Sequence, residues 1–429
     1  MANYNRSSGE IKRSIYNFSN RITSGIKKTQ KTFIFQMLYG LSEGNLCHLS
    51  EIARRLKEKI TLKKTIERLS RNLQQFDDQA NIWANYMDSV KEHTKEASIL
   101  LIDNSEFVKP CSEHMQGLCK VRDGSTGEIA RGYHTIDAAV LSKDGKMPLP
   151  VYSRVFSSEE KEFISQTDEN LRCLSYLSQH FNPTCIRTLD RGFDANAYFQ
   201  YFLDPKRKEK FIIRLKKTRM VIHQGESVNV LDVANQYKGK YAITFRDKKN
   251  RKIDCKMAYI PVRCAFAPNT NLTLIVVYGF GKVPMLLLSN LLYEDLKNLA
   301  MTITKVYLLR WRIEEYFKFK KNQFQLEDFR VMSLASIRNF NLIATLLTGY
   351  IGFLSESRWD SIFVQELLVC SKRIFSIPNF CFYALGYAIS DILKKTTVGI
   401  QSFLRRKPSS QQLDLFSLPA FRSQQLLLS

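Results

Sequence analysis

Two adjacent glutamates stand inside a run of cations and aromatic rings, YLLRWRIEEYFKFKK, at residues 307–321. If this run is one helix, with about 100° between successive residues, most of its apolar side chains share one side, which would face a core. Four polar residues fall within an opposite arc of about 60°: Tyr307, Arg310, Glu314 and Lys321. Glu315 lies outside this arc and is expected to pair with Arg312 or Lys318 at the surface. The spacing therefore predicts that Glu314, and not Glu315, stands in a column with two cations and a phenol.

Two aspartates extend this set of acids. Asp103 in SILLIDNSE and Asp190 in CIRTLDRGFD each come at the end of an apolar run that predicts a strand. A carboxylate at a strand end projects from the rigid edge of a core, where it can meet a metal and a substrate. His134 and Asp137, on a neighbouring predicted strand, are interpreted as structural.

A carboxylate flanked by cations is more often part of a salt bridge on a solvated face than part of a catalytic site. Three convergent carboxylates have another use, because they could hold two divalent metal ions. Such ions clamp the attacking and leaving oxygens of a phosphodiester. The sequence therefore predicts a metal-dependent reaction on a phosphodiester, with Asp103, Asp190 and Glu314 as the metal ligands.

The charge of the chain favours a nucleic-acid partner. Over 429 residues, 64 Lys and Arg stand against 41 Asp and Glu, which gives a net charge of +23, and such an excess favours polyanions. The run PKRKEKFIIRLKKTR, residues 205–219, contains eight basic residues and one acid. Runs of this kind are most often solvated faces, but beside Asp190 contact with double-stranded DNA is the better interpretation. The predicted DNA contacts outside the column are Arg191, Arg214, Lys216, Lys217 and Lys318.

Cysteine usage and hydropathy indicate an intracellular protein. The nine cysteines show no CxxC pair, so reduced thiols are expected rather than a disulfide framework or a zinc site. The N-terminus lacks the apolar core of a signal peptide. The apolar stretch Leu342–Leu354 is shorter than the roughly 20 residues that a bilayer requires. We therefore expect a cytoplasmic protein with no membrane partner.

The elements that must position the acids change type along the chain. Residues 1–95 are predicted to be helical, and they suit either a helix-turn-helix that enters the major groove of DNA or a plain helical hairpin. Strands and helices over 96–217 and 291–350 predict an αβα core with a mixed sheet. Residues 218–290 contain successive strand patterns and predict an all-β insertion. Residues 351–429 are expected to form a helical C-terminal region that ends in a loose polar tail.

At the acids and the cationic helix, the chain resembles a known family. Four positions match the Y-R-E-K signature of bacterial insertion-sequence transposases with a DDE catalytic triad: Tyr307-x2-Arg310-x3-Glu314-x6-Lys321. Asp103 and Asp190 resemble the first and second acids of that triad, and a β insertion between the second and third acids also matches. The resemblance covers about residues 95–350.

The resemblance implies a ribonuclease-H-like fold whose three carboxylates bind two Mg²⁺ or Mn²⁺ ions. It implies hydrolysis at transposon ends, then attack of the new 3′-hydroxyls on target DNA, by a homodimer in the bacterial nucleoid. Tyr307, Arg310 and Lys321 would grip phosphates near the cut. A hairpin intermediate is left open, because the insertion has no Trp and a Tyr or Phe would have to hold the flipped base.

Two other functions are compatible with the same residues. A nuclease of this fold would cut DNA without joining it to a target. A non-catalytic repressor derived from a transposase would bind DNA and do neither, but it would have no need of Asp103, Asp190 and Glu314 together. Joining of a cut end to a target plasmid separates a transposase from a nuclease.

Overall fold

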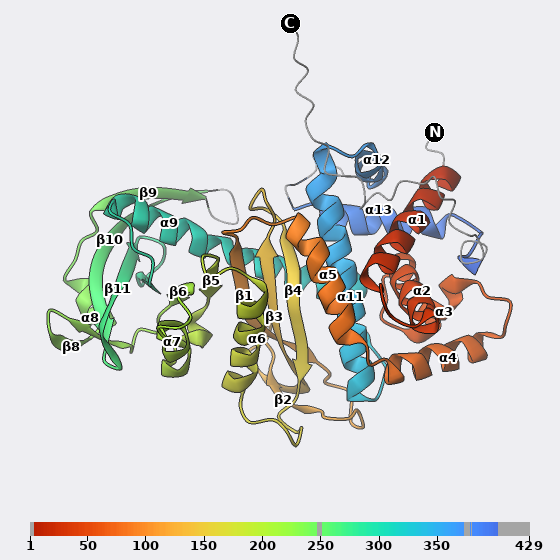
Figure 1. Ribbon diagram of the computed structural model, residues 1–429, viewed down its shortest axis with the longest axis horizontal. Coiled ribbons are helices and arrows are strands. Elements are labelled where there is room, and N and C mark those ends of the chain that lie inside the picture. Colours follow the sequence, from red (N-terminus) through yellow and green to blue (C-terminus); the bar gives the residue numbers. More distant parts are fainter. Residues whose placement is uncertain (1–3, 247–250, 373–377, 379, 402–429) are drawn as a thin grey trace, which may run out of the picture.

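The computed structural model describes residues 4–246, 251–372, 378 and 380–401. Its centre is a mixed sheet of 12 strands that extends through an elongated molecule, with helices on its faces and a group of helices at one end (Figure 1). The strands, in chain order, are β1 (Ile99–Val108), β2 (Cys119–Arg122), β3 (Ile129–Leu141), β4 (Pro148–Phe156), β5 (Ile186–Leu189), β6 (Lys210–Arg214), β7 (Met220–His223), β8 (Glu226–Asn229), β9 (Tyr241–Arg246), β10 (Lys252–Cys264), β11 (Ala267–Tyr278) and β12 (Met285–Ser289).

Helices from the two ends of the chain pack together. The helices before the first strand are α1 (Tyr4–Ile22), α2 (Lys28–Gly44), α3 (Leu49–Leu56), α4 (Leu62–Gln75) and α5 (Gln79–Glu92). The helices after the last strand are α9 (Leu296–Leu309), α10 (Trp311–Phe324), α11 (Leu334–Glu356), α12 (Ile362–Cys370) and α13 (Phe382–Lys394). Asn339 of α11 donates to the carbonyl oxygens of Leu73 and Phe76, at 2.7 and 2.9 Å, and so holds the end of α4.

The helices predicted within residues 1–95 are therefore present, and they lie against α11 and α13. Helices α3 and α4 lie side by side, bury Ile52 and Leu69, and expose Lys63 and Lys64. This arrangement of α3 and α4 is compatible with both a helix-turn-helix and a plain helical hairpin. Within the described ranges, no helix is both long and apolar enough to cross a membrane. The predicted tail beyond residue 401 lies outside the described residues.

Five strands form the core of the sheet, in the order β4-β3-β1-β5-β6. Strands β4, β3 and β1 are antiparallel neighbours, whereas β5 runs parallel to β1 and β6 runs parallel to β5. Helix α6 (Gln166–His180) connects β4 to β5, and α7 (Asn196–Leu203) lies between β5 and β6. This order confirms the predicted ribonuclease-H-like core with a mixed sheet.

Alternate side chains of β4 contact two helical layers. Arg154 pairs with Glu169 of α6, with 2.6 Å between Nε and Oε2. Ser153 is bonded instead to Lys320 of α10 and Asn341 of α11. Because successive strand residues point to opposite faces, α6 covers one face of the core sheet, and α10 and α11 cover the other.

The segment 218–290 extends the core sheet. Strand β12 pairs antiparallel with β6, and the order continues through β11, β10 and β7 to β8, with β9 beside β10. Helix α9 packs against β9, β10, β11 and β12 at the left of Figure 1. One short helix, α8 (Val230–Asn235), lies within this otherwise β segment. It forms because Val230, Val233 and Ala234 have the i, i+3, i+4 spacing of a helix that buries one side.

Candidate active site

Asp103 lies in the middle of β1 and not, as predicted, at its end. Strand β3 pairs with β1 as far as Val108, so β1 continues well beyond Asp103. Strand β5, on the other side, pairs with β1 only from Ile99 to Leu101. The apolar run stops at Asp103 because one flank of the strand is open from there on, and a carboxylate can project there.

Asp190 directly follows β5, as predicted, and begins the short turn η1 (Arg191–Phe193). Its Oδ1 accepts a hydrogen bond of 2.6 Å from the N–H of Gly192. A Cβ atom on Gly192 would lie 2.9 Å from this oxygen, so glycine lets the carboxylate fold back onto the turn. Strands β1 and β5 are parallel neighbours that pair as far as Leu101 and Thr188. Asp103 and Asp190 each come two residues later, so they lie just beyond the same end of the paired segment.

The run 307–321 forms two helices rather than one. Helix α9 ends and α10 begins on either side of Arg310, which has helical backbone angles, φ −53° and ψ −29°. The N–H of Arg310 donates to the carbonyl of Tyr307, and its own carbonyl accepts from Ile313, both across three residues and at 3.0 Å. This turn is tighter than an α-helix, so the single helical register assumed for the run is broken at Arg310.

Arg310 joins two of the predicted acids. Its Nη1 lies 2.6 Å from Oδ2 of Asp103, and its Nη2 lies 3.2 Å from Oε1 of Glu314. The side chain of Arg310 is 8% exposed, against 16% for Asp103 and 37% for Glu314. The Nε of Arg310 has no hydrogen-bond partner within the described part of the chain. A buried N–H left unpaired costs about 1–3 kcal/mol, so the guanidinium is incompletely satisfied here.

The charges of Asp190 and Glu314 act on Asp103. Burial raises the pKa of Asp103 to about 7; Arg310 opposes the rise, and the charges of Asp190 and Glu314 add to it. Burial lowers the pKa of Arg310, but the surrounding acids outweigh this and raise it overall. Arg310 therefore contacts Asp103 and Glu314, and the charge of Asp190 acts on both Asp103 and Arg310.

Glu315 belongs to a different contact. It accepts a hydrogen bond of 2.6 Å from Nη1 of Arg312, and its side chain is 44% exposed. This confirms the predicted surface pair. Glu314 and Glu315 thus point to different surroundings, and only Glu314 faces Asp103 through Arg310.

The donor set has the chemistry that Mg²⁺ and Mn²⁺ prefer, since all three side chains offer hard carboxylate oxygens on strands or a helix. Two of the three are engaged by Arg310, and in the ranges that the structure describes no group of three acids, histidines or cysteines is arranged as a metal site. The residues therefore fit divalent ions provided that Arg310 turns aside.

The other predicted DNA contacts lie in different surroundings. Tyr307 is 1% exposed, and burial raises the pKa of its phenol. The charges of Arg310 and of Arg214, at the end of β6, oppose this rise. Lys321 lies 3.3 Å from Glu327 and 3.5 Å from Glu106. Tyr307 and Lys321 thus remain predictions, one buried and one ion-paired in this structure. The remaining predicted contacts are exposed: Arg191, Lys216, Lys217 and Lys318.

A buried ion pair behind the acids was missed from the sequence. The Nζ of Lys320, which is 1% exposed, lies 2.5 Å from Oδ1 of Asp137, and this oxygen also accepts from the Tyr316 hydroxyl at 2.8 Å. Asp137 is the register partner of Asp103 across β3 and β1. It is therefore structural, and it ties α10 to the strand beside the first acid. The sequence feature that could have revealed this pair is Lys320 on the apolar side of the helix, because a cation there requires a buried acceptor.

One family model matches part of the chain, and one solved structure is distantly similar to it. The family model described as "Transposase DDE domain" matches residues 172–348, a range that includes Asp190 and Glu314 but not Asp103. A search of curated proteins gave no match. A cryo-EM structure of a piggyBac transposase synaptic complex with hairpin DNA is 11% identical, with 96% of this chain and 83% of that chain covered and a TM-score of 0.44. The family match supports a DDE transposase.

Proposed function

We propose that this protein is a DNA transposase that cuts transposon ends and joins them to target DNA in a cut-and-paste reaction. The observation that carries the proposal is that one buried arginine bonds Asp103 and Glu314, while the charge of Asp190 acts on the same group. The match to the DDE domain, which spans two of the three acids, supports the same assignment.

The three carboxylates would hold two Mg²⁺ or Mn²⁺ ions, which when bound supply charge to the phosphodiester and activate the attacking oxygen. Arg310 neutralises part of the charge of Asp103 and Glu314 and keeps β1 and α10 together. A guanidinium in this position can also donate to a phosphate oxygen beside the acids. Of the two acids that Arg310 bonds, Glu314 is the more exposed, at 37% against 16% for Asp103. A DNA strand would therefore approach the site from the side of Glu314.

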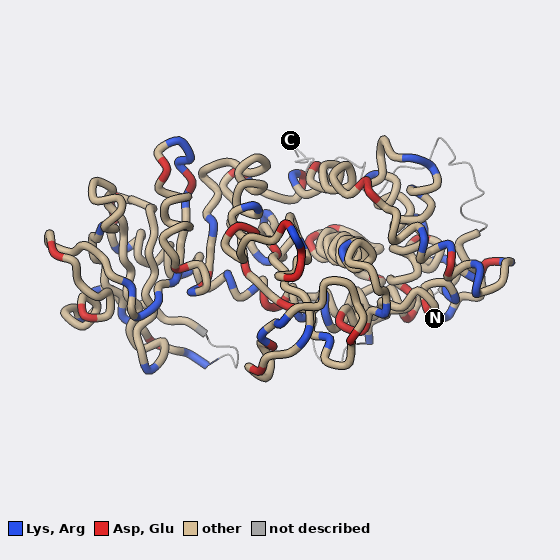
Figure 2. The backbone as a smooth tube through the Cα atoms, turned by 90° about the horizontal axis from the view of Figure 1, so that it is seen from below, with Lys and Arg blue, Asp and Glu red and all other residues tan. Residues whose placement is uncertain are grey.

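Double-stranded DNA is the proposed substrate. Lys and Arg are spread along the whole length of the molecule (Figure 2), and exposed cations follow the strand ends near Asp190. Asp194, which is 2% exposed, accepts from the N–H of Lys216 and from Nε of Arg219, both at 2.6 Å. This contact ties the loop after β5 to the loop after β6. The two loops that carry these cations are therefore held together. Contacts of the cations with phosphates would make DNA binding sensitive to salt.

Two protein copies are the proposed assembly. Cut-and-paste chemistry acts on both ends of one element, and both ends must reach the same target. A homodimer holding paired ends meets this requirement, with one set of acids at each end.

The test compares two neighbouring glutamates. Glu314→Gln keeps the size of the side chain but removes its charge, so it should abolish strand cleavage while end binding is retained. Glu315→Gln is the matched control, because it loses only an exposed contact with Arg312 worth about 0.2–0.5 kcal/mol. Cleavage by this control should stay within a few-fold of the parent.

The assay uses a plasmid that carries the sequences flanking the reading frame, a second plasmid as target, and Mg²⁺ or Mn²⁺. The parent should yield cut ends and joined products. Cut ends without joined products would indicate a nuclease, and binding without cutting would indicate a repressor. An inactive Glu315→Gln with an active Glu314→Gln would contradict the assignment of the third acid.

A further inference from the structure

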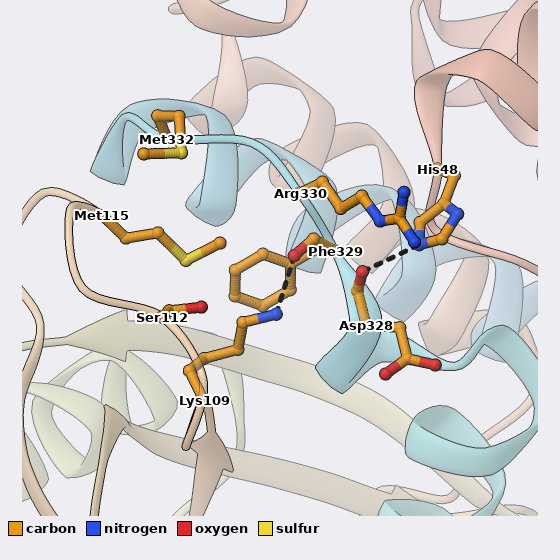
Figure 3. Close-up of a pocket in the computed structure, with 8 residues that line it drawn as sticks. All are labelled: His48, Lys109, Ser112, Met115, Asp328, Phe329, Arg330 and Met332. Atoms are coloured by element: carbon orange, nitrogen blue, oxygen red, sulfur yellow. Dashed lines mark hydrogen bonds between the residues drawn. The ribbon is translucent and has the colours of Figure 1, made fainter.

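A pocket of about 450 Å³ lies where three parts of the chain meet (Figure 3). One wall is the connection between α2 and α3, the second is the segment after β1, and the third is the segment that joins α10 to α11. The pocket is separate from the acids described above. Its polar lining includes His48, Lys109, Ser112, Asp328 and Arg330.

Lys109 is the buried cation of this pocket, with 8% of its surface exposed. Its Nζ donates to the carbonyl oxygens of Glu327 and Phe329, both at 2.7 Å, and lies 4.3 Å from the centre of the Phe329 ring. An ammonium group has three N–H donors, and the two carbonyls take two of them. The third is left for an acceptor in the pocket, and a buried charge is costly without one.

Arg330 and Ser112 also offer donors, whereas the N–H of His48 is already engaged by the backbone. Arg330 is exposed, and Ser112 contributes a half-buried hydroxyl. The Nε2 of His48 lies 2.9 Å from the carbonyl oxygen of Asp328, and because a carbonyl only accepts, this nitrogen carries the proton. In Figure 3 the carboxylate of Asp328 is turned away from the amine of Lys109. The pocket therefore presents cations and donors, which suit a phosphate group.

Helix α10 connects this pocket with the acids. Arg310, just before α10, bonds Asp103 on β1, and Lys321, near its end, pairs with Glu106 further along the same strand. Beyond α10, the Oε1 of Glu327 accepts from the N–H of Val108 at 3.2 Å. The helix thus runs alongside β1 from the acids toward the pocket. Lys109 is six positions after Asp103, a distance of about 20 Å along an extended strand, which is the rise of about six base pairs.

We propose that this pocket binds a backbone phosphate of duplex DNA, about six base pairs from the cut. The inference rests on the proposed function, since it requires that the acids act on DNA. A phosphate contact at this place would fix the position of the duplex without reading its sequence. It would also tie the DNA to the junction between the N-terminal helices and the catalytic core, because His48 belongs to the first and Lys109 to the second.

The test measures duplex binding by the full-length protein over a range of salt concentrations. Each phosphate that a cation neutralises contributes about 0.9 to the slope of log affinity against log salt. Arg330→Gln removes an exposed cation of the pocket and should lower the slope by about one. Asp328→Asn keeps the backbone carbonyl that His48 bonds but removes the negative charge of a residue that lines the pocket. Less repulsion of phosphate should tighten duplex binding.

Lys143→Gln is the matched control. Lys143 is exposed in the turn after β3, and the end of β3 that pairs with Val108 lies at Gly132. The control therefore stands about 30 Å from the pocket along that strand. It should leave the slope unchanged.

The outcomes separate the inference from the proposed function. An unchanged slope in Arg330→Gln, or an equal drop in Lys143→Gln, overturns the inference while leaving transposition standing. A parent that binds no labelled duplex overturns both. Inorganic phosphate provides the last comparison: if it raises the melting temperature of the parent and not of Arg330→Gln, while the duplex slope is the same in both, the pocket takes free phosphate and the DNA assignment is wrong.

Discussion

Lys320→Met should lower the free energy of unfolding by about 3–5 kcal/mol, the usual cost of removing one partner of a buried ion pair. Methionine keeps much of the length of lysine but removes the ammonium that lies 2.5 Å from Asp137. Asp137 is fully buried, and its Oδ2 already lacks a hydrogen-bond partner among the described residues. The variant would leave this charge with the hydroxyl of Tyr316. Because α10 carries both Lys320 and Glu314, strand cleavage should fall as well.

The double variant Asp137→Asn with Lys320→Met tests the cause of the loss. Asparagine keeps the shape of Asp137 without its charge, and the Tyr316 hydroxyl can still donate to its Oδ1, so the double variant leaves no unpaired buried charge and should recover most of the free energy. Urea unfolding followed by tryptophan fluorescence suits the measurement, since Trp311 lies on α10. A double variant as unstable as Lys320→Met would refute the reasoning, because the loss would then come from packing rather than from an unpaired charge.

Three further outcomes are expected. Gly192→Ala should slow cleavage by up to about a hundredfold with little change in stability, because its Cβ would meet Oδ1 of Asp190 at 2.9 Å; unchanged cleavage would count against Asp190. Mn²⁺ should raise the melting temperature of the parent by selective binding to the folded state, and Glu314→Gln should lose most of this shift; a parent that does not respond would contradict the metal assignment. Sizing with end DNA should give two protein copies on paired ends, and a single copy on one end that still joins ends would exclude the dimer.

Apolar patterns predict most of the core, because strands and helices that bury one face must alternate polar and apolar residues at a fixed period. The same patterns do not report strand pairing. Asp103 therefore looked like the end of a strand, although β3 supports β1 as far as Val108. The polar stretch begins there because β5 ends, and the end of a neighbouring strand is a tertiary fact that no local pattern contains.

In the column of polar residues, the spacing predicted only contacts between residues that are close in sequence. Arg310 reaches Glu314 because residues four apart share a helix face. Lys321 comes after a further seven residues and finds its partners, Glu106 and Glu327, on elements that the spacing does not specify. The break at Arg310 also turns Tyr307 into the core on the preceding helix. Side-chain neighbours set by one helical turn can thus be inferred from spacing, whereas neighbours set by packing cannot.

The charges of the three acids exceed the charge of Arg310. Three carboxylates close to one another would repel, and Arg310 offsets part of this repulsion by bonding Asp103 and Glu314. Burial is the main reason why the pKa of Asp103 is raised to about 7; the charge of Arg310 opposes this rise, and the charges of Asp190 and Glu314 add to it. In the proposed function, divalent cations would neutralise the charge that Arg310 does not offset. Arg310 links β1 and α10 through these two contacts, and in the proposed reaction bound cations would take over part of its neutralising role.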